Sequence, residues 1–192
     1  MKTLLWFAPY LLLLLLCQCQ SPGSLRESVA VKTHFTAAEA EDLATLLAFF
    51  DREVCGDTAL AACYEHAFTK PLPIPFTQQK AMLDSLSSPL PYQIWVRGWQ
   101  KQGTDSLAFL FYTPQDHYLA YLQSVAADEK TLEPYLSELT AYGDVSAKAT
   151  RALLQAYQAA GVSDPRIRVV HAIHWLTLHD QQNRDEVLPP FN

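Results

Sequence analysis

The sequence predicts a mainly α-helical protein, with about six or seven helices and one β-hairpin packed on them. Through most of the chain after residue 35, apolar residues recur at helical spacing between proline and glycine breaks. Residues 92–112 differ, because aromatic and β-branched residues there flank a short polar turn, which is typical of a hairpin. Hydrophobic residues make up 49% of the chain, too many for a disordered protein.

The first predicted helix begins at a capping box, in which the side chains of Thr36 and Glu39 each accept the backbone N–H of the other residue. An apolar stripe at helical spacing follows, and Gly56 ends it. The elements predicted next are a short helix from residue 57 or 58 to about 68, an extended proline-rich crossing at 71–75, and a helix over about 77–87.

The hairpin predicted at 92–112 carries the candidate binding surface. Strand alternation separates two tryptophans and an arginine from smaller residues, so that one face holds Trp95, Arg97 and Trp99 and the other holds Ile94, Val96 and Gly98. We expect the aliphatic face to pack on the helices and the tryptophan face to bind a peptide or a carbohydrate, because exposed aromatic patches often mark interaction sites. A helical conformation for 106–112 stays open.

Four further helices are predicted in the C-terminal half. Thr113-Pro114 is a cap followed by proline at the first helical position, and Gly143 and Gly161 end two of the helices. The predicted ranges are about 113–127, 132–142, 145–160 and 165–178. The last range is rich in β-branched residues and also fits a strand, but its cap, its length and its polar end favour a helix.

The first 25 residues have the layout of an export signal. Lys2 is their only charge, and the apolar run at 4–16 spans about 20 Å as a helix, which is short of a bilayer core. Cys17 follows directly, with Leu14 three positions before it. This segment resembles the precursor of a bacterial lipoprotein, although Leu16 stands where such precursors usually have a small residue. Cys19 is the alternative lipidated cysteine.

The resemblance implies a signal peptide over residues 1–16, an acylated Cys17, and attachment to the membrane through the N-terminal lipid. The protein would then lie in the cell envelope, on the outer membrane or facing the periplasm. Residues 17–34 lack a periodic apolar face and are interpreted as a tether, which leaves 35–192 as a single α-rich domain. An uncleaved membrane anchor and soluble secretion are the alternatives.

Two cysteines, Cys55 and Cys63, lie outside this leader. On one continuous helix they would be about 12 Å apart, too far for a disulfide. The Gly56-Asp57 break allows two helices to bring them together, and export makes an oxidising compartment plausible. We therefore predict a disulfide between them, with two buried thiols as the alternative.

The sequence predicts no catalytic residue and no cofactor. His171 and His174 would share a helical face, but their spacing is not that of a zincin helix and no third metal ligand is indicated. We interpret the pair as structural, with a metal-dependent hydrolase as the alternative. Fourteen basic against twenty acidic residues argue against nucleic-acid binding. The leading hypothesis is a non-enzymatic interaction or structural module with an envelope protein or peptide as its partner.

Overall fold

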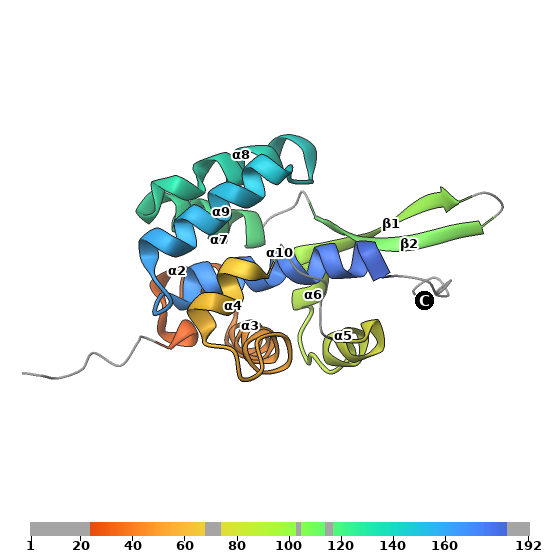
Figure 1. Ribbon diagram of the computed structural model, residues 1–192, viewed down its shortest axis with the longest axis horizontal. Coiled ribbons are helices and arrows are strands. Elements are labelled where there is room, and N and C mark those ends of the chain that lie inside the picture. The colour runs from red at the N-terminus through yellow and green to blue at the C-terminus, as the bar shows by residue number, and fades with distance from the viewer. Residues whose placement is uncertain (1–23, 68–73, 103–104, 114–116, 184–192) are drawn as a thin grey trace, which may run out of the picture.

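The structure is a computed structural model that describes residues 24–67, 74–102, 105–113 and 117–183, with backbone alone over 97–109 (Figure 1). The predicted leader, including Cys17 and Cys19, lies outside the described residues. In the described part the fold is mainly helical with one antiparallel hairpin, as predicted. The elements are α2 (Val29–His34), α3 (Ala37–Phe49), α4 (Leu60–His66), α5 (Phe76–Asp84), α6 (Leu90–Ile94), β1 (Trp95–Gln102), β2 (Asp105–Tyr112), α7 (His117–Asp128), α8 (Glu133–Tyr142), α9 (Ala147–Ala160) and α10 (Pro165–Asn183).

The described residues form nine α-helices, where six or seven were expected. The two that the sequence did not indicate are short. Helix α2 lies in the expected tether, where Leu25 and Val31 are buried in the core, so the folded part extends N-terminal to residue 35. Helix α6 occupies the expected start of the hairpin, because Pro91 fits the first turn of a helix and Leu90 and Ile94 both face the core.

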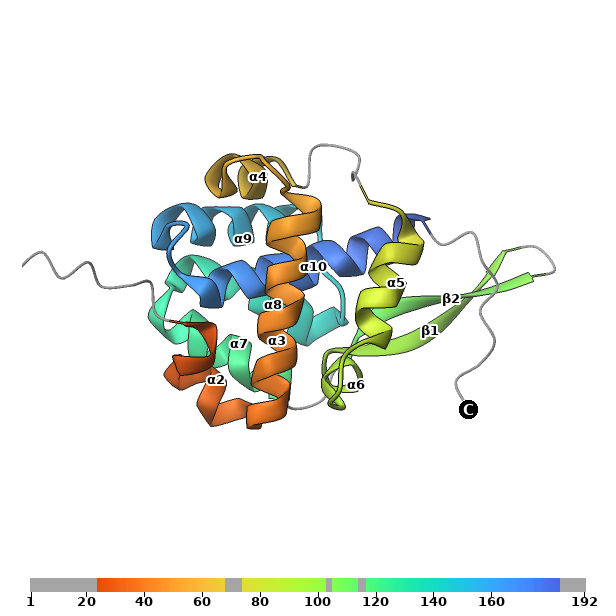
Figure 2. The same ribbon diagram turned by 90° about the horizontal axis from the view of Figure 1, so that it is seen from below.

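Helix α10 lies at the centre of the molecule (Figures 1 and 2). Helices α7, α8 and α9 lie on one side of it and α3, α5 and α6 on the other. The helical interpretation of this segment is confirmed, and nearly every side chain from Ile167 to Leu176 is buried. A helix that is buried on all sides needs apolar residues all round, which explains why its sequence also resembled a buried strand.

The hairpin packs on the C-terminal half of α10. Strand β1 pairs with β2 in an antiparallel register that places Trp95 opposite Tyr112. At Leu110, the backbone N–H donates to Asp180 Oδ1 at 2.8 Å and the carbonyl accepts from Gln181 Nε2 at 2.9 Å. Side chains of α10 thus satisfy both backbone groups of Leu110 at the edge of β2, while the far end of the hairpin projects away from the helices (Figure 1).

The predicted disulfide is present and joins the end of the first long helical segment to α4. The Cα atoms of Cys55 and Cys63 are 5.4 Å apart, within the range that a disulfide requires. Between them Gly56 has a φ of +53°, a left-handed conformation that side chains with a Cβ rarely adopt. The capping box of Thr36 and Glu39 at the start of α3 is also confirmed.

Candidate functional site

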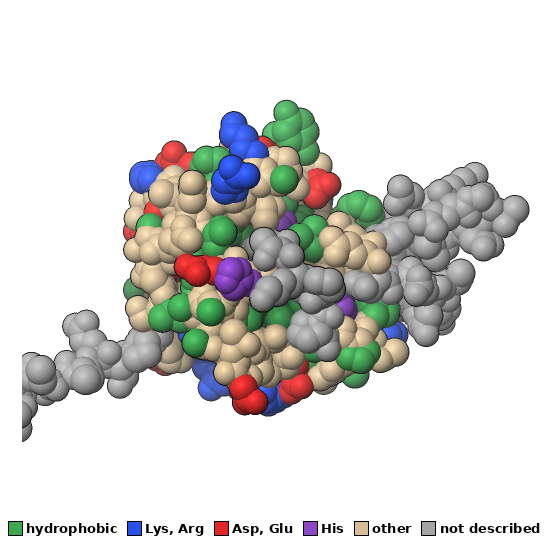
Figure 3. Space-filling model, viewed as in Figure 1, with side chains coloured by type: hydrophobic (Ala, Val, Ile, Leu, Met, Phe, Trp, Pro, Cys, Tyr) green, Lys and Arg blue, Asp and Glu red, His purple; other side chains and the backbone are tan. Residues whose placement is uncertain are grey.

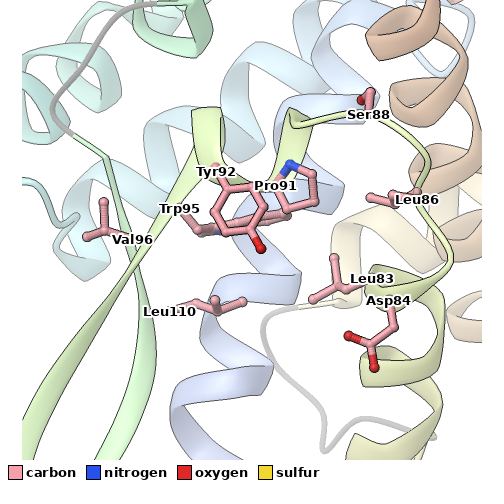
Figure 4. Close-up of a pocket in the computed structure, with 9 residues that line it drawn as sticks. All are labelled: Leu83, Asp84, Leu86, Ser88, Pro91, Tyr92, Trp95, Val96 and Leu110. Atoms are coloured by element: carbon pink, nitrogen blue, oxygen red, sulfur yellow. The ribbon is translucent and has the colours of Figure 1, made fainter. Parts of the chain in front are cut away.

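An apolar groove lies between α5, α6 and the base of the hairpin (Figure 4). Its volume is about 480 Å³, within the range of small-ligand pockets. Asp84 and Ser88 are its polar residues. Its apolar lining consists of Leu83, Leu86, Pro91, Tyr92, Trp95, Val96 and Leu110. We call this feature the apolar groove.

The floor of the groove is fixed by hydrogen bonds to α10. The indole Nε1 of Trp95 donates to Thr177 Oγ1 at 2.8 Å, and the ring is only 3% exposed. Leu110 is also buried, and its backbone is held by α10 as described above. In Figure 4, Trp95 and Leu110 lie over α10 on one side of the groove, and Leu83 stands opposite on α5.

The loop between α5 and α6 is held by Asp42 from α3. The Asp42 carboxylate is 4% exposed and accepts the backbone N–H groups of Ser88 at 2.7 Å and Ser87 at 3.2 Å. Burial alone would raise the pKa of Asp42, but the hydrogen bonds from the two serines lower it below its ordinary value. The carboxylate therefore stays ionised at neutral pH and fixes the loop wall of the groove.

The rim of the groove exposes apolar side chains to water. Tyr92 is 64% exposed and Val96 43% exposed, which makes them two of the five large hydrophobic residues exposed in the described part of the chain. In Figure 4, the Tyr92 ring lies beside Pro91 and close to Trp95. A rigid apolar floor below an exposed aromatic rim is the arrangement expected of a binding groove.

The expected orientation of the hairpin is wrong at its base. Strand alternation predicts Trp95 on the exposed face and Val96 on the core face, but Trp95 is buried and Val96 is exposed. The large indole removes more apolar surface from water than valine does, and α10 supplies Thr177 as an acceptor for its N–H. The side chains of Arg97 and Trp99 lie outside the described residues, so their binding role stays a prediction.

The histidines of α10 lie in the core. His171 packs edge-on against Tyr64 and Tyr157, with ring centroids 5.1 and 5.7 Å away. Burial lowers the pKa of His171 well below its ordinary value and that of His174 to about 3. Both imidazoles are therefore neutral at physiological pH.

Hydroxyl groups surround His174. Its Nδ1 lies 3.0 Å from Tyr112 Oη and 3.3 Å from Tyr135 Oη, and its Nε2 lies 3.1 Å from Thr150 Oγ1. Within the described ranges, no three or more His, Cys, Asp or Glu side chains form a group that could hold a metal ion. The surroundings of His174 thus suit a buried neutral imidazole, and we keep the interpretation of the pair as structural.

A partly buried ion pair ties α10 to the segment after α3. Arg168 contacts the Asp51 carboxylate, which also accepts the Tyr64 hydroxyl at 2.8 Å. Burial raises the pKa of Asp51 more than the charge of Arg168 lowers it. The guanidinium also lies over the Tyr64 ring, 5.8 Å from its centroid. These contacts connect α10, α4 and the segment after α3.

A second, larger hollow of about 910 Å³ lies beside α2, α7 and the start of α10. Its lining is more polar, and its Arg166 already pairs with Asp128 and Asp164. On the face shown in Figure 3, acidic and basic side chains are interspersed rather than gathered by sign. We therefore take the apolar groove as the candidate functional site.

Comparisons with protein-family models, with curated proteins and with solved structures found no match for this chain. Among the described helices, none has both the length and the apolar character that crossing a bilayer requires. Sequence reasoning missed the groove because its walls come from three separate segments. The local signal that could have pointed to it is the pair Pro91-Tyr92, which the sequence pattern divides between the end of a helix and the start of the hairpin.

Proposed function

We propose that this protein is a lipid-anchored cell-envelope protein that acts as a non-enzymatic binding module, with the apolar groove as its binding site. The leader supports the envelope location through its resemblance to lipoprotein precursors. The observation that carries the binding role is the pair of exposed apolar side chains, Tyr92 and Val96, at the rim of a groove whose floor is held by α10.

The groove favours an extended apolar segment of a peptide or protein as the ligand. A ligand that covers Tyr92 and Val96 removes their apolar surface from water, which favours binding by about 25 cal/mol per Å² of surface buried. Aromatic grooves beside a proline are also the surfaces on which extended, proline-containing segments dock, because such segments lose little conformational entropy on binding. Asp84 lies at the rim with Lys80 as its ion-pair partner, so the groove presents no uncompensated charge of Asp84 to such a ligand.

Replacing Tyr92 or Val96 with aspartate is expected to weaken binding of N-phenyl-1-naphthylamine, a neutral apolar fluorescent probe, by about tenfold. An ionised carboxylate next to the bound probe would have to lose water without gaining a partner. Fluorescence titration of the purified protein measures the effect.

The matched control for these variants is Tyr142→Asp. Tyr142 is 81% exposed on α8, which contributes no residue to the groove. Its substitution should leave probe affinity unchanged, and circular dichroism should show all three variants folded. If the probe binds the rim variants as tightly as the unmodified protein, the groove is not its binding site.

Lipidation is expected at Cys17. Intact-mass analysis of protein extracted from membranes should show a mature chain that begins at Cys17 and carries a diacylglycerol or triacyl adduct. The Cys17→Ser variant should lose the adduct and move to the soluble fraction, because the acyl chains supply the membrane affinity. A mature chain without lipid, or one that begins beyond Cys19, would contradict the lipoprotein proposal.

A further inference from the structure

We propose that residues 184–192 of this chain (RDEVLPPFN) dock in the apolar groove as an intramolecular competitor of its external ligand. The proposal rests on the groove being the binding site. Helix α10 ends near the groove, and the sequence that follows it contains an apolar run, as does the lining of the groove.

The C-terminal half of α10 is held against α5 and the hairpin, the elements on either side of the groove. On the α5 side, Gln79 Nε2 donates to the Leu176 carbonyl at 2.9 Å, and Gln79 Oε1 lies 2.6 Å from His179 Nδ1. On the hairpin side, Gln181 donates to the carbonyl of Leu110, whose side chain lines the groove. Helix α10 ends at Asn183, two residues after Gln181, so the following segment starts next to the groove.

The segment is long enough to extend along a groove of this size. Nine residues follow α10 in the sequence, and nine extended residues span at most about 30 Å. The groove itself holds about 480 Å³, so it accommodates a few side chains rather than the whole segment. The segment is therefore long enough to dock in the groove of its own chain.

The sequence of the segment divides into a charged and an apolar part. The charged part comes first and favours exposure to solvent; it consists of Arg184, Asp185 and Glu186. The apolar run 187–191 (VLPPF) follows. Pro189-Pro190 favours a polyproline II conformation, which lowers the entropy lost on docking. Aromatic-lined grooves recognise this conformation, and the exposed Tyr92 ring beside Pro91 offers such a surface.

Docking within one chain reduces the apparent affinity of any other ligand. A tethered segment competes at an effective concentration on the order of millimolar, whatever the protein concentration. If it occupies the groove nine-tenths of the time, an external ligand binds about tenfold more weakly than to the empty groove.

The test compares the affinity of N-phenyl-1-naphthylamine for three proteins: the unmodified chain, a chain ending at Asn183, and the double variant Leu188→Ser with Phe191→Ser. The truncated chain and the double variant should bind the probe about tenfold more tightly. The double variant Asp185→Asn with Glu186→Gln is the matched control, and its affinity should equal that of the unmodified chain. Adding Tyr92→Asp to each background should remove the gain.

Two outcomes separate this inference from the proposed function. If the three proteins bind the probe equally and Tyr92→Asp weakens binding in each, the inference is overturned and the groove remains the binding site. If Tyr92→Asp changes nothing in any background, the proposed function fails, and this inference fails with it.

Crosslinking identifies the occupant directly. With p-benzoylphenylalanine in place of Tyr92, irradiation of the purified protein should yield a monomer whose crosslinked peptide contains residues 184–192. Crosslinked dimers joined through those residues would assign the groove to a second copy and overturn the intramolecular proposal. Crosslinks to other segments, or no crosslink to 184–192, would overturn it as well.

Discussion

Replacing Trp95 with alanine should lower the free energy of unfolding by about 3–5 kcal/mol, because it empties a fully packed site of its largest side chain. Trp95 is 3% exposed and connects the hairpin to α10 through its hydrogen bond to Thr177. Thr177 in turn donates to the Ile173 carbonyl of its own helix, and this second hydrogen bond fixes the hydroxyl that accepts from Trp95. Urea unfolding followed by circular dichroism measures the loss.

Trp95→Phe is the control that separates packing from hydrogen bonding. It keeps an aromatic ring but removes the donor to Thr177, and it should cost about 1–2 kcal/mol. A loss below about 1 kcal/mol for Trp95→Ala would mean that the hairpin base does not pack on α10 as described. Because the substitution removes the floor of the groove, loss of ligand binding by Trp95→Ala alone would not identify a binding residue, whereas the rim variants do.

The protein should lose stability in acid through the buried histidines of α10. Burial lowers the pKa of His174 in the folded protein to about 3, against an ordinary value of 6.5. As the pH falls, the unfolded chain therefore takes up the proton before the folded protein does. The free energy of unfolding is unaffected by His174 above about pH 6.5 and declines as the pH falls towards 3. At pH 4 the loss from His174 alone is about 3 kcal/mol, and His171, whose pKa is lowered in the same direction, adds to it.

The difference between the unmodified protein and His174→Gln isolates this effect. Glutamine does not titrate, and the other titrating groups, including the carboxylates of Asp42 and Asp164, are common to both proteins. Urea unfolding between pH 7 and pH 4 should show the variant losing about 3 kcal/mol less stability than the unmodified protein. Equal losses would show that His174 takes up its proton equally in the folded and unfolded states.

Local sequence signals predicted most of the helices correctly. The capping box at Thr36 and the glycine at 143 mark helix boundaries in the structure, because caps and left-handed residues act through neighbouring backbone groups. The disulfide also followed from local reasoning, since Gly56 breaks the chain between Cys55 and Cys63. Helices α2 and α6 escaped prediction because each is short and is held by one or two buried side chains rather than by a periodic stripe.

The orientation of the hairpin was decided by tertiary structure. Alternation in the sequence separates Trp95 from Val96 but does not say which of them faces the core. That choice depends on Thr177, which lies 82 residues further along the chain and accepts the indole N–H. Sequence reasoning favoured the aliphatic face, whereas the folded protein buries the larger ring and satisfies its donor.

The chain's sequence thus determined by itself the elements whose causes are local: the capped helices, the hairpin, the disulfide and the layout of the leader. Only the tertiary structure decided the candidate site, because the apolar groove is built from α5, α6 and both strands, with α10 as its support. The physical reason lies in the range of the forces. Caps and turns act within a few residues, whereas burial and hydrogen bonds across the core join segments that no local pattern relates.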